Sequence, residues 1–294
     1  MRNAECGVRN KKVIAIALFI LFVVGAAYPA QDQQINQKIA VLEKIQGKFT
    51  FVVLGDNRTG DDQYRTLVSM IAARKPDFVI NTGDMIATPG DKQQWANFWS
   101  LSAPIPAPYF LVLGNHDAHP KVAFSERTYQ EQVDLPGNEL YYSFAAGKSL
   151  FIILDSFIEG QEKKITGDQF TWLKGVLAQP GFQHKFVFLH HPLSTEAGKG
   201  HHSGDSLDKY PQDRDQLEAL FVSSKVDAVF AGHEHYYQRK SVDGITHVIT
   251  GGGGAPMYEK DENGGFYHFL VVSVDGDKVN AEVVDISGNV RDKF

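Results

Sequence analysis

The sequence carries side chains that can bind metal ions at five places where an apolar, strand-like run ends. They are Asp56, Asp84, Asn115 with His116, His190 with His191, and His233 with His235. A single Gly-Asp after a strand is usually a turn, and a single buried histidine usually satisfies a hydrogen bond. Because open sheets place their sites at the carboxyl ends of strands, this recurrence instead favours one shared site.

The residue types at these strand ends predict a site for two metal ions. Carboxylates can bridge two cations, while imidazoles and an amide oxygen complete each coordination shell. Two ions about 3.5–4 Å apart can hold an ester oxygen and lower the pKa of a bound water. The sequence therefore predicts metal-assisted hydrolysis at the edge of a sheet.

The elements that must position these side chains alternate along the chain. Apolar strands are expected over residues 49–55, 77–82 and 109–113, with helical periodicity over 62–74 and 91–101 between them. Such alternation implies a mostly parallel sheet that is covered on both faces. Further elements are expected as a hairpin over 140–155 that turns at Gly147-Lys148, helices over 167–178 and 213–223, strands over 185–190 and 226–231, and an antiparallel tail over 245–286. The predicted fold is α/β, with two facing mixed β-sheets (a β-sandwich) flanked by helices.

Composition and charge limit the classes of function. The 294 residues are 43% hydrophobic and 22% charged, which is ordinary for a globular protein. The formal net charge is −6, and it is more negative still without the basic N-terminal stretch. An acidic body argues against a general nucleic-acid binder, which needs a basic surface. With Cys6 as its only cysteine, the chain cannot form a disulfide within itself.

The N-terminus has the pattern of an export signal. Arg9, Lys11 and Lys12 precede an apolar run over residues 13–27, and small residues follow up to Ala30. A helix needs about 20 apolar residues to span a membrane, and this run is shorter. The alternative is a retained membrane anchor. We expect a signal peptide over 1–30, a helical linker segment over 31–47, and a catalytic domain over 48–294. The mature protein is then periplasmic or secreted, or membrane-anchored if the signal is not cleaved.

The order of the motifs resembles the calcineurin-like metallophosphoesterase superfamily. The matching motifs are Gly55-Asp56, Gly83-Asp84, Gly114-Asn115-His116-Asp117, His190-His191-Pro192 and Gly232-His233-Glu234-His235. The sequence from Gly232 to Arg239 and the run from Gly251 to Pro256 are most similar to the purple acid phosphatase-like branch. The resemblance covers residues 49 to about 255. It is specific for the superfamily and unspecific for the substrate.

The resemblance implies a role for each motif residue. Asp84 bridges both metals, Asp56 and His235 hold the first metal, and Asn115, His190 and His233 hold the second. His116 contacts the phosphate or protonates the leaving group, which suits a histidine near neutral pH. Asp117 either orients His116 or is an ordinary turn residue. His191 is a neighbour of the centre. His201 and His202 in the following polar loop are interpreted as solvated, with metal binding as the alternative.

Two positions depart from the family pattern. Many members have a histidine two residues after the first aspartate, where this chain has Arg58. Purple acid phosphatases have a tyrosine three residues after the second aspartate, where this chain has Ala87. The first metal is therefore left with Asp56, Asp84 and His235, and no purple colour is expected. Arg58 either binds a substrate phosphate as a planar donor or is a surface residue near Asp61 and Asp62.

The resemblance implies a hydrolase that cleaves phosphate esters, principally monoesters, with a metal-bridging hydroxide. The cofactors are two metal ions, and the ligand set does not choose among manganese, iron and zinc. The partner is a small phosphate-ester substrate, with no nucleic acid, no stable membrane partner after signal cleavage, and an open oligomeric state. The alternatives are a phosphodiesterase for cyclic nucleotides or lipid headgroups, and an inactive binding domain that keeps the fold.

Overall fold

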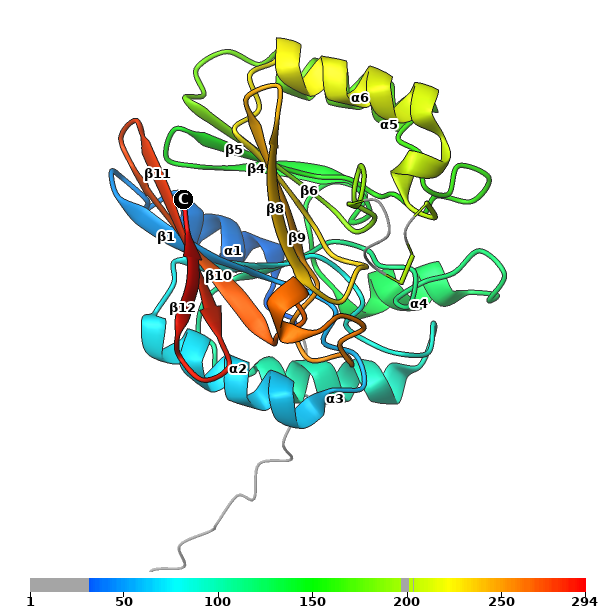
Figure 1. The fold of residues 1–294 in the computed structure, drawn as a ribbon, viewed down its shortest axis with the longest axis vertical. Helices are drawn as coiled ribbons and strands as arrows, with labels where there is room; N and C mark the ends of the chain where they lie inside the picture. Colours follow the sequence, from blue (N-terminus) through cyan, green and yellow to red (C-terminus); the bar gives the residue numbers. More distant parts are fainter. Residues whose placement is uncertain (1–31, 197–200, 203) are drawn as a thin grey trace, which may run out of the picture.

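The computed structural model describes residues 32–196, 201–202 and 204–294, which form two facing β-sheets with helices outside them (Figure 1). The first sheet has the strand order β12 (Val290–Lys293), β11 (Lys278–Asp285), β10 (His268–Asp275), β1 (Phe49–Leu54), β2 (Phe78–Asn81) and β3 (Tyr109–Leu111). The second has the order β4 (Tyr142–Ala146), β5 (Ser149–Ile153), β6 (His184–Leu189), β7 (Ala228–Ala231), β9 (Ile245–Thr250) and β8 (Tyr237–Val242).

Both sheets are of mixed direction, which confirms the predicted fold class. In the first sheet β1, β2 and β3 run parallel, while β10, β11 and β12 are antiparallel. In the second sheet β5, β6, β7 and β9 run parallel, and the edge strands β4 and β8 are antiparallel. The parallel strands direct their carboxyl ends to one edge of each sheet. That edge is where the predicted ligands follow.

Helices cover the outer faces of the sandwich. They are α1 (Ile35–Leu42), α2 (Asp61–Arg74), α3 (Lys92–Ser102), α4 (Ser125–Gln132), α5 (Gly167–Leu177) and α6 (Pro211–Ser223), with short 3-10 turns at Leu207–Lys209 and Asp261–Asn263. In Figure 1, α2 and α3 lie along the first sheet, and α5 and α6 lie along the second. The apolar stripe of α2 is buried as its periodicity predicts, because one helix face must exclude water against the sheet.

Phenylalanine rings join the two sheets. Phe51 and Phe78 of the first sheet lie with their ring centroids 5.4 Å apart. Phe151 of the second sheet contacts both edge-on, each at 5.1 Å, and Phe186 lies 5.5 Å from Phe51. All four are fully buried. Each aromatic pair contributes about 0.5–1.5 kcal/mol beyond its buried area, so this cluster fixes one sheet against the other.

The structure corrects the predicted tail. Residues 245–286 were expected to be antiparallel throughout, but β9 pairs in parallel with β7 and in antiparallel only with β8. The pattern did not predict β8, because this edge strand is polar and partly exposed along its length. Helix α4 was also not predicted, since its sequence is polar and only Ser125, Thr128 and Tyr129 are buried.

The segment before β1 packs on the folded body. Lys38 on α1 is fully buried, and its ammonium donates to the Asp32 carboxylate and to the Tyr109 carbonyl oxygen. The Asp32 carboxylate also accepts the backbone N–H of Asp134. The predicted signal peptide lies outside the described residues. No helix within those residues is long and apolar enough to cross a membrane.

A buried carboxylate follows β5. Asp155 is fully buried, and one of its oxygens accepts the N–H of Phe157 at 2.7 Å. Its other oxygen, Oδ2, has no hydrogen-bond partner among the described residues. The Gln169 side chain instead pairs with the Asp155 backbone, with which it makes two 2.8 Å bonds. Burial raises the pKa of Asp155 to about 7, because no cation offsets the lost hydration.

We predict that Asp155 makes the protein less stable as pH rises from about 4 to 7. In that window the folded state holds a proton that the unfolded chain has lost, so stability falls and then levels off above the folded pKa. The loss is on the order of 4 kcal/mol, at about 1.4 kcal/mol per pKa unit. Urea unfolding at pH 4.5 and pH 8 should show this loss shrinking in Asp155→Asn. An unchanged pH dependence in the variant would contradict the assignment.

Candidate metal centre

Six side chains with ligand atoms follow strands of both sheets and gather at their common edge. The first sheet supplies Asp56 after β1, Asp84 after β2 and Asn115 after β3. The second sheet supplies His190 after β6, with His233 and His235 after β7. All are buried except Asn115, which is partly exposed. The sandwich therefore brings together residues separated by up to about 180 positions in the sequence.

Three of these residues have strained backbones. Asp56, Asp84 and His233 have φ values of 59°, 59° and 69°, in the left-handed region that side chains other than glycine rarely adopt. Each such residue costs on the order of 1–3 kcal/mol and persists only where the surroundings hold it. Gly83, which precedes Asp84, lets the loop pack closely against His190, because a Cβ at Gly83 would lie 2.6 Å from Nδ1 of His190. Such strain is concentrated at functional sites in proteins generally.

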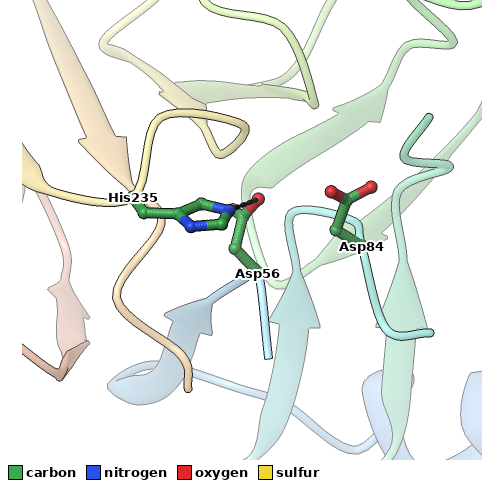
Figure 2. Close-up of side chains that lie close together, drawn as sticks. All are labelled: Asp56, Asp84 and His235. Carbon is green, nitrogen blue, oxygen red and sulfur yellow. Dashed lines mark ion pairs between the residues drawn. The ribbon is translucent and has the colours of Figure 1, made fainter. Parts of the chain in front are cut away.

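The first group of ligands consists of Asp56, Asp84 and His235. Their ligand atoms all lie within 4.8 Å of one another. Figure 2 shows the His235 ring directed at the Asp56 carboxylate, with Nε2 3.6 Å from Oδ1 and the Asp84 carboxylate opposite. Nδ1 of His235 lies 2.8 Å from the Pro256 carbonyl oxygen, which fixes the ring, while Nε2 is buried without a hydrogen-bond partner among the described residues. A metal ion fits this orphaned nitrogen.

The second group is centred on the Asn115 amide oxygen. It lies 3.1 Å from Nε2 of His190 and 3.0 Å from Nδ1 of His233. Nε2 of His190 is also 3.3 Å from the Asp84 carboxylate, so Asp84 adjoins both groups. Nδ1 of His190 lies 2.8 Å from the Thr82 carbonyl oxygen. Metal-binding histidines are usually oriented by such a bond from the other ring nitrogen.

The protonation of the site favours cation binding. Burial lowers the pKa of His235 to about 4, and burial also lowers the pKa values of His190 and His233. These rings are therefore neutral, as ligands must be. Burial and the neighbouring Asp84 carboxylate raise the pKa of Asp56. The pKa of Asp84 is instead lowered, although its burial alone would raise it, with Arg58 among the groups that lower it. Asp56 can therefore ionise beside Asp84 at neutral pH only with added positive charge, which bound metal ions would supply.

The structure places His116 at the centre and gives Asp117 a different role from the one considered. The backbone N–H of His116 donates to the Asp84 carboxylate at 2.9 Å, and its Nδ1 lies 2.9 Å from the Ala87 carbonyl oxygen. Asp117 is fully buried and accepts backbone N–H groups of the Asp84 loop, including those of Asp84 and Met85 at 2.8 Å. It is therefore not an exposed turn residue, and it makes no hydrogen bond to the His116 ring.

The two unusual positions supply no ligand. Nε of Arg58 lies 3.1 Å from the Asp84 carboxylate, and the Arg58 side chain is 14% exposed. Arg58 thus pairs with the predicted bridging residue and not with Asp61 or Asp62. Ala87 contributes only its backbone, whose N–H donates to the Gln94 side chain.

Tyr258 was not predicted to lie near the ligands, and the contacts that His191 and His202 make there were not predicted either. The His202 ring lies 4.3 Å from the His233 ring, and Tyr258 stacks on His235 at 4.5 Å. The interpretation of solvated histidines fits the exposed His201 but not His202, which is half-buried. His191 is fully buried and bonds through Nδ1 to Ser156 Oγ at 2.9 Å. The only sequence signal for these residues was their position in loops that follow or precede ligands.

Comparisons with known proteins agree with this geometry. The family model described as calcineurin-like phosphoesterase matches residues 49–237. Purple acid phosphatase 5 of Arabidopsis thaliana is 26% identical over 227 residues, which are 74% of this chain and 51% of that protein. A nucleotide pyrophosphatase/phosphodiesterase of Hordeum vulgare is 23% identical over 62% of this chain and 58% of its own length. The chain spans about half the length of the curated relatives it matches.

Solved structures give the same result for the fold. The purple acid phosphatase PPD1 from yellow lupin (Lupinus luteus) seeds superposes with a TM-score of 0.69 at 20% identity. The match covers 91% of this chain and 54% of the lupin protein. The family model, the strand order and the motifs at the strand ends all lead to one assignment. The chain belongs to the calcineurin-like phosphoesterase family, and it is similar to purple acid phosphatases.

Proposed function

We propose that the chain hydrolyses phosphate monoesters with a centre that holds two metal ions. The observation that carries this proposal is the convergence of six candidate ligand side chains, with the buried Nε2 of His235 left without a partner in the part of the chain that the structure describes. Asp84 would bridge, Asp56 and His235 would hold the first ion, and Asn115, His190 and His233 would hold the second. When bound, such ions neutralise phosphoryl charge and lower the pKa of water. Manganese, iron and zinc all suit these ligands.

His116 is proposed to protonate the leaving alcohol. Its Nδ1 faces the Ala87 carbonyl oxygen, which can only accept, so Nδ1 carries a hydrogen. The proton available for transfer is therefore the one on Nε2. The backbone of His116 is fixed to the Asp84 carboxylate, which keeps the ring beside the metal ligands. Asp117 supports this arrangement indirectly, because it holds the backbone of the Asp84 loop.

Arg58 is proposed to bind the substrate phosphate. Its Nε is used by the Asp84 carboxylate, while its two terminal nitrogens make no hydrogen bond with the described residues. Those nitrogens form a planar pair of donors that matches two phosphoryl oxygens. A fixed cation beside two metal ions favours the dianion of a monoester over a singly charged diester. The purple acid phosphatases among the relatives support the monoester, whereas the phosphodiesterase among them keeps diester hydrolysis as the second candidate.

Metal removal and substitution test the proposed centre. We expect the metal-free protein to be inactive on a chromogenic monoester and added manganese to restore turnover.

Asp84→Asn should lose bound metal, whereas His116→Ala should keep its metal content and lose about 10²–10⁴-fold in kcat on a poor leaving group. Elemental analysis and steady-state kinetics measure both effects. Full activity in verified metal-free protein would rule the mechanism out.

Arg58 is tested by its charge and by its shape. Arg58→Ala should lower kcat/KM for a monoester by roughly 10- to 150-fold at saturating metal, as expected for a charge-assisted hydrogen bond. A diester should be affected less, because it carries one negative charge fewer. Arg58→Lys keeps the charge without the donor pair and serves as the control. If Arg58→His instead raises activity at limiting metal, the arginine mainly weakens the first metal site. Unchanged kcat/KM in Arg58→Ala would leave it without a role.

Export is proposed from the N-terminal pattern, with residues 1–30 removed, 31–47 as a surface segment and 48–294 as the catalytic domain. Asp32 supports cleavage before it, because its carboxylate is buried and holds Lys38. Expression of the full sequence should yield a periplasmic or secreted protein that begins near Gln31 or Tyr28. N-terminal sequencing of each cell fraction measures this. An intact Met1 on cytosolic protein would refute export.

A further inference from the structure

Two adjacent histidines outside the ligand set lie beside the ligand histidines that follow β7, one in direct ring contact and the other through Tyr258. The His202 ring lies directly on the His233 ring, with centroids 4.3 Å apart and planes inclined by 30°. The His201 ring stacks on Tyr258 at 4.4 Å, and Tyr258 stacks on His235 at 4.5 Å. The His201-His202 dipeptide therefore borders both candidate metal positions, one directly and one through Tyr258.

A single buried carboxylate holds this dipeptide. Glu234 is fully buried, and its two oxygens accept the backbone N–H of His202 at 3.1 and 3.3 Å. Glu234 lies between His233 and His235 in the sequence, yet its carboxylate is not part of the group that Asp56, Asp84 and His235 form. The three-residue segment therefore has two functions. Its outer residues face the metal positions, and its middle residue faces the dipeptide.

The position of Glu234 is costly unless it has a use. A carboxylate without exposure loses its hydration, and only hydrogen bonds to it recover part of that loss. The His202 N–H donates to the Glu234 oxygens, and hydrogen bonds of this kind depend on direction as well as distance. Ring stacking is worth about 0.5–1.5 kcal/mol per pair and does not by itself fix the backbone of a loop dipeptide. The carboxylate supplies the directional contact that the ring stacks lack.

We infer that Glu234 is a positioning residue that holds His202 against the ligand His233, so that the His201-His202 dipeptide borders the place where the substrate phosphate would bind. The inference rests on the proposed function, because the position of the dipeptide matters only if phosphate binds at the metal centre. Glu234 acts through His202 and touches neither substrate nor metal. Its loss should therefore displace the dipeptide and leave the metal ligands in place.

The experiment compares Glu234→Leu, which removes both acceptor oxygens, with Glu234→Gln, which keeps one. The first readout is hydrogen exchange of the His202 amide in metal-free protein. The second is the affinity of the manganese-loaded protein for inorganic phosphate, measured together with metal content. Glu234→Leu should speed exchange and weaken phosphate binding by roughly 5- to 150-fold, as for a buried N–H that loses its acceptor, at unchanged metal content. Glu234→Gln should recover most of both quantities.

Two further variants make the test specific. Glu218→Leu is the matched control, because Glu218 pairs with the His247 ring on the second sheet and contacts neither His202 nor the ligands. It should leave His202 exchange and phosphate affinity unchanged. The double variant Glu234→Leu with His202→Ala should bind phosphate no more weakly than His202→Ala alone, because residues that act through one another are not additive.

Three results would overturn the inference. They are unchanged His202 exchange in Glu234→Leu, loss of metal in that variant, and multiplied losses in the double variant. If Glu234→Leu does not fold, the unaltered protein still decides, because its His202 amide must be protected from exchange. A protein that binds phosphate and shows the expected exchange but hydrolyses no ester would refute the proposed function and leave the positioning role intact.

Discussion

Two buried carboxylates that lie beside each other need positive charge nearby, and the rest of the site is arranged around this need. Asp56 and Asp84 are both buried, at 0% and 1% exposure. Burial and the Asp84 carboxylate raise the pKa of Asp56, whereas the pKa of Asp84 is lowered, with Arg58 among the groups that lower it. Neutral imidazoles cannot offset two such charges, and Arg58 supplies a single cation. Ionising Asp56 as well as Asp84 therefore calls for added positive charge. The strand ends of both sheets that converge here, and the left-handed backbone of three of their residues, hold the side chains in the arrangement that binding of such charge requires.

Backbone carbonyl oxygens and N–H groups orient four side chains of the candidate site, namely three histidine rings and one carboxylate. The rings of His190, His235 and His116 each direct Nδ1 at a carbonyl oxygen, those of Thr82, Pro256 and Ala87 respectively. Asp117 works in the opposite sense, because its carboxylate accepts backbone N–H groups of neighbouring turns. Ring orientation and loop shape are consequently coupled. Turns that bear ligands cannot shift without breaking bonds that fix the ligands themselves.

The sequence predicts the strand ends well, because each candidate ligand follows an apolar run and the parallel strands of a sheet direct their carboxyl ends to one edge. It predicts the orienting contacts poorly, because their partners are backbone groups that every residue carries. Asp117 shows the difference: its type and spacing are equally compatible with a turn, a helper of His116 and a loop anchor, and only the fold selects the last. Strand β8 escaped prediction for a related reason, since an edge strand needs no apolar face. The contact of Glu234 with His202 was not predicted either, because only the two histidines of its motif were considered for a role.

Arg58, which stands where many family members have a histidine, changes the balance of charge at the candidate centre. A histidine there would add a neutral ligand, whereas arginine adds a permanent charge that cannot bind a cation. The Arg58–Asp84 contact of 3.1 Å places this charge against the residue that would bridge both ions, so a metal and Arg58 compete for the same carboxylate. A phosphate dianion resolves the competition, because it offers oxygens to the guanidinium and the metals at once. Metal and substrate should therefore bind this protein more tightly together than either binds alone, which is the reciprocal coupling that linkage requires.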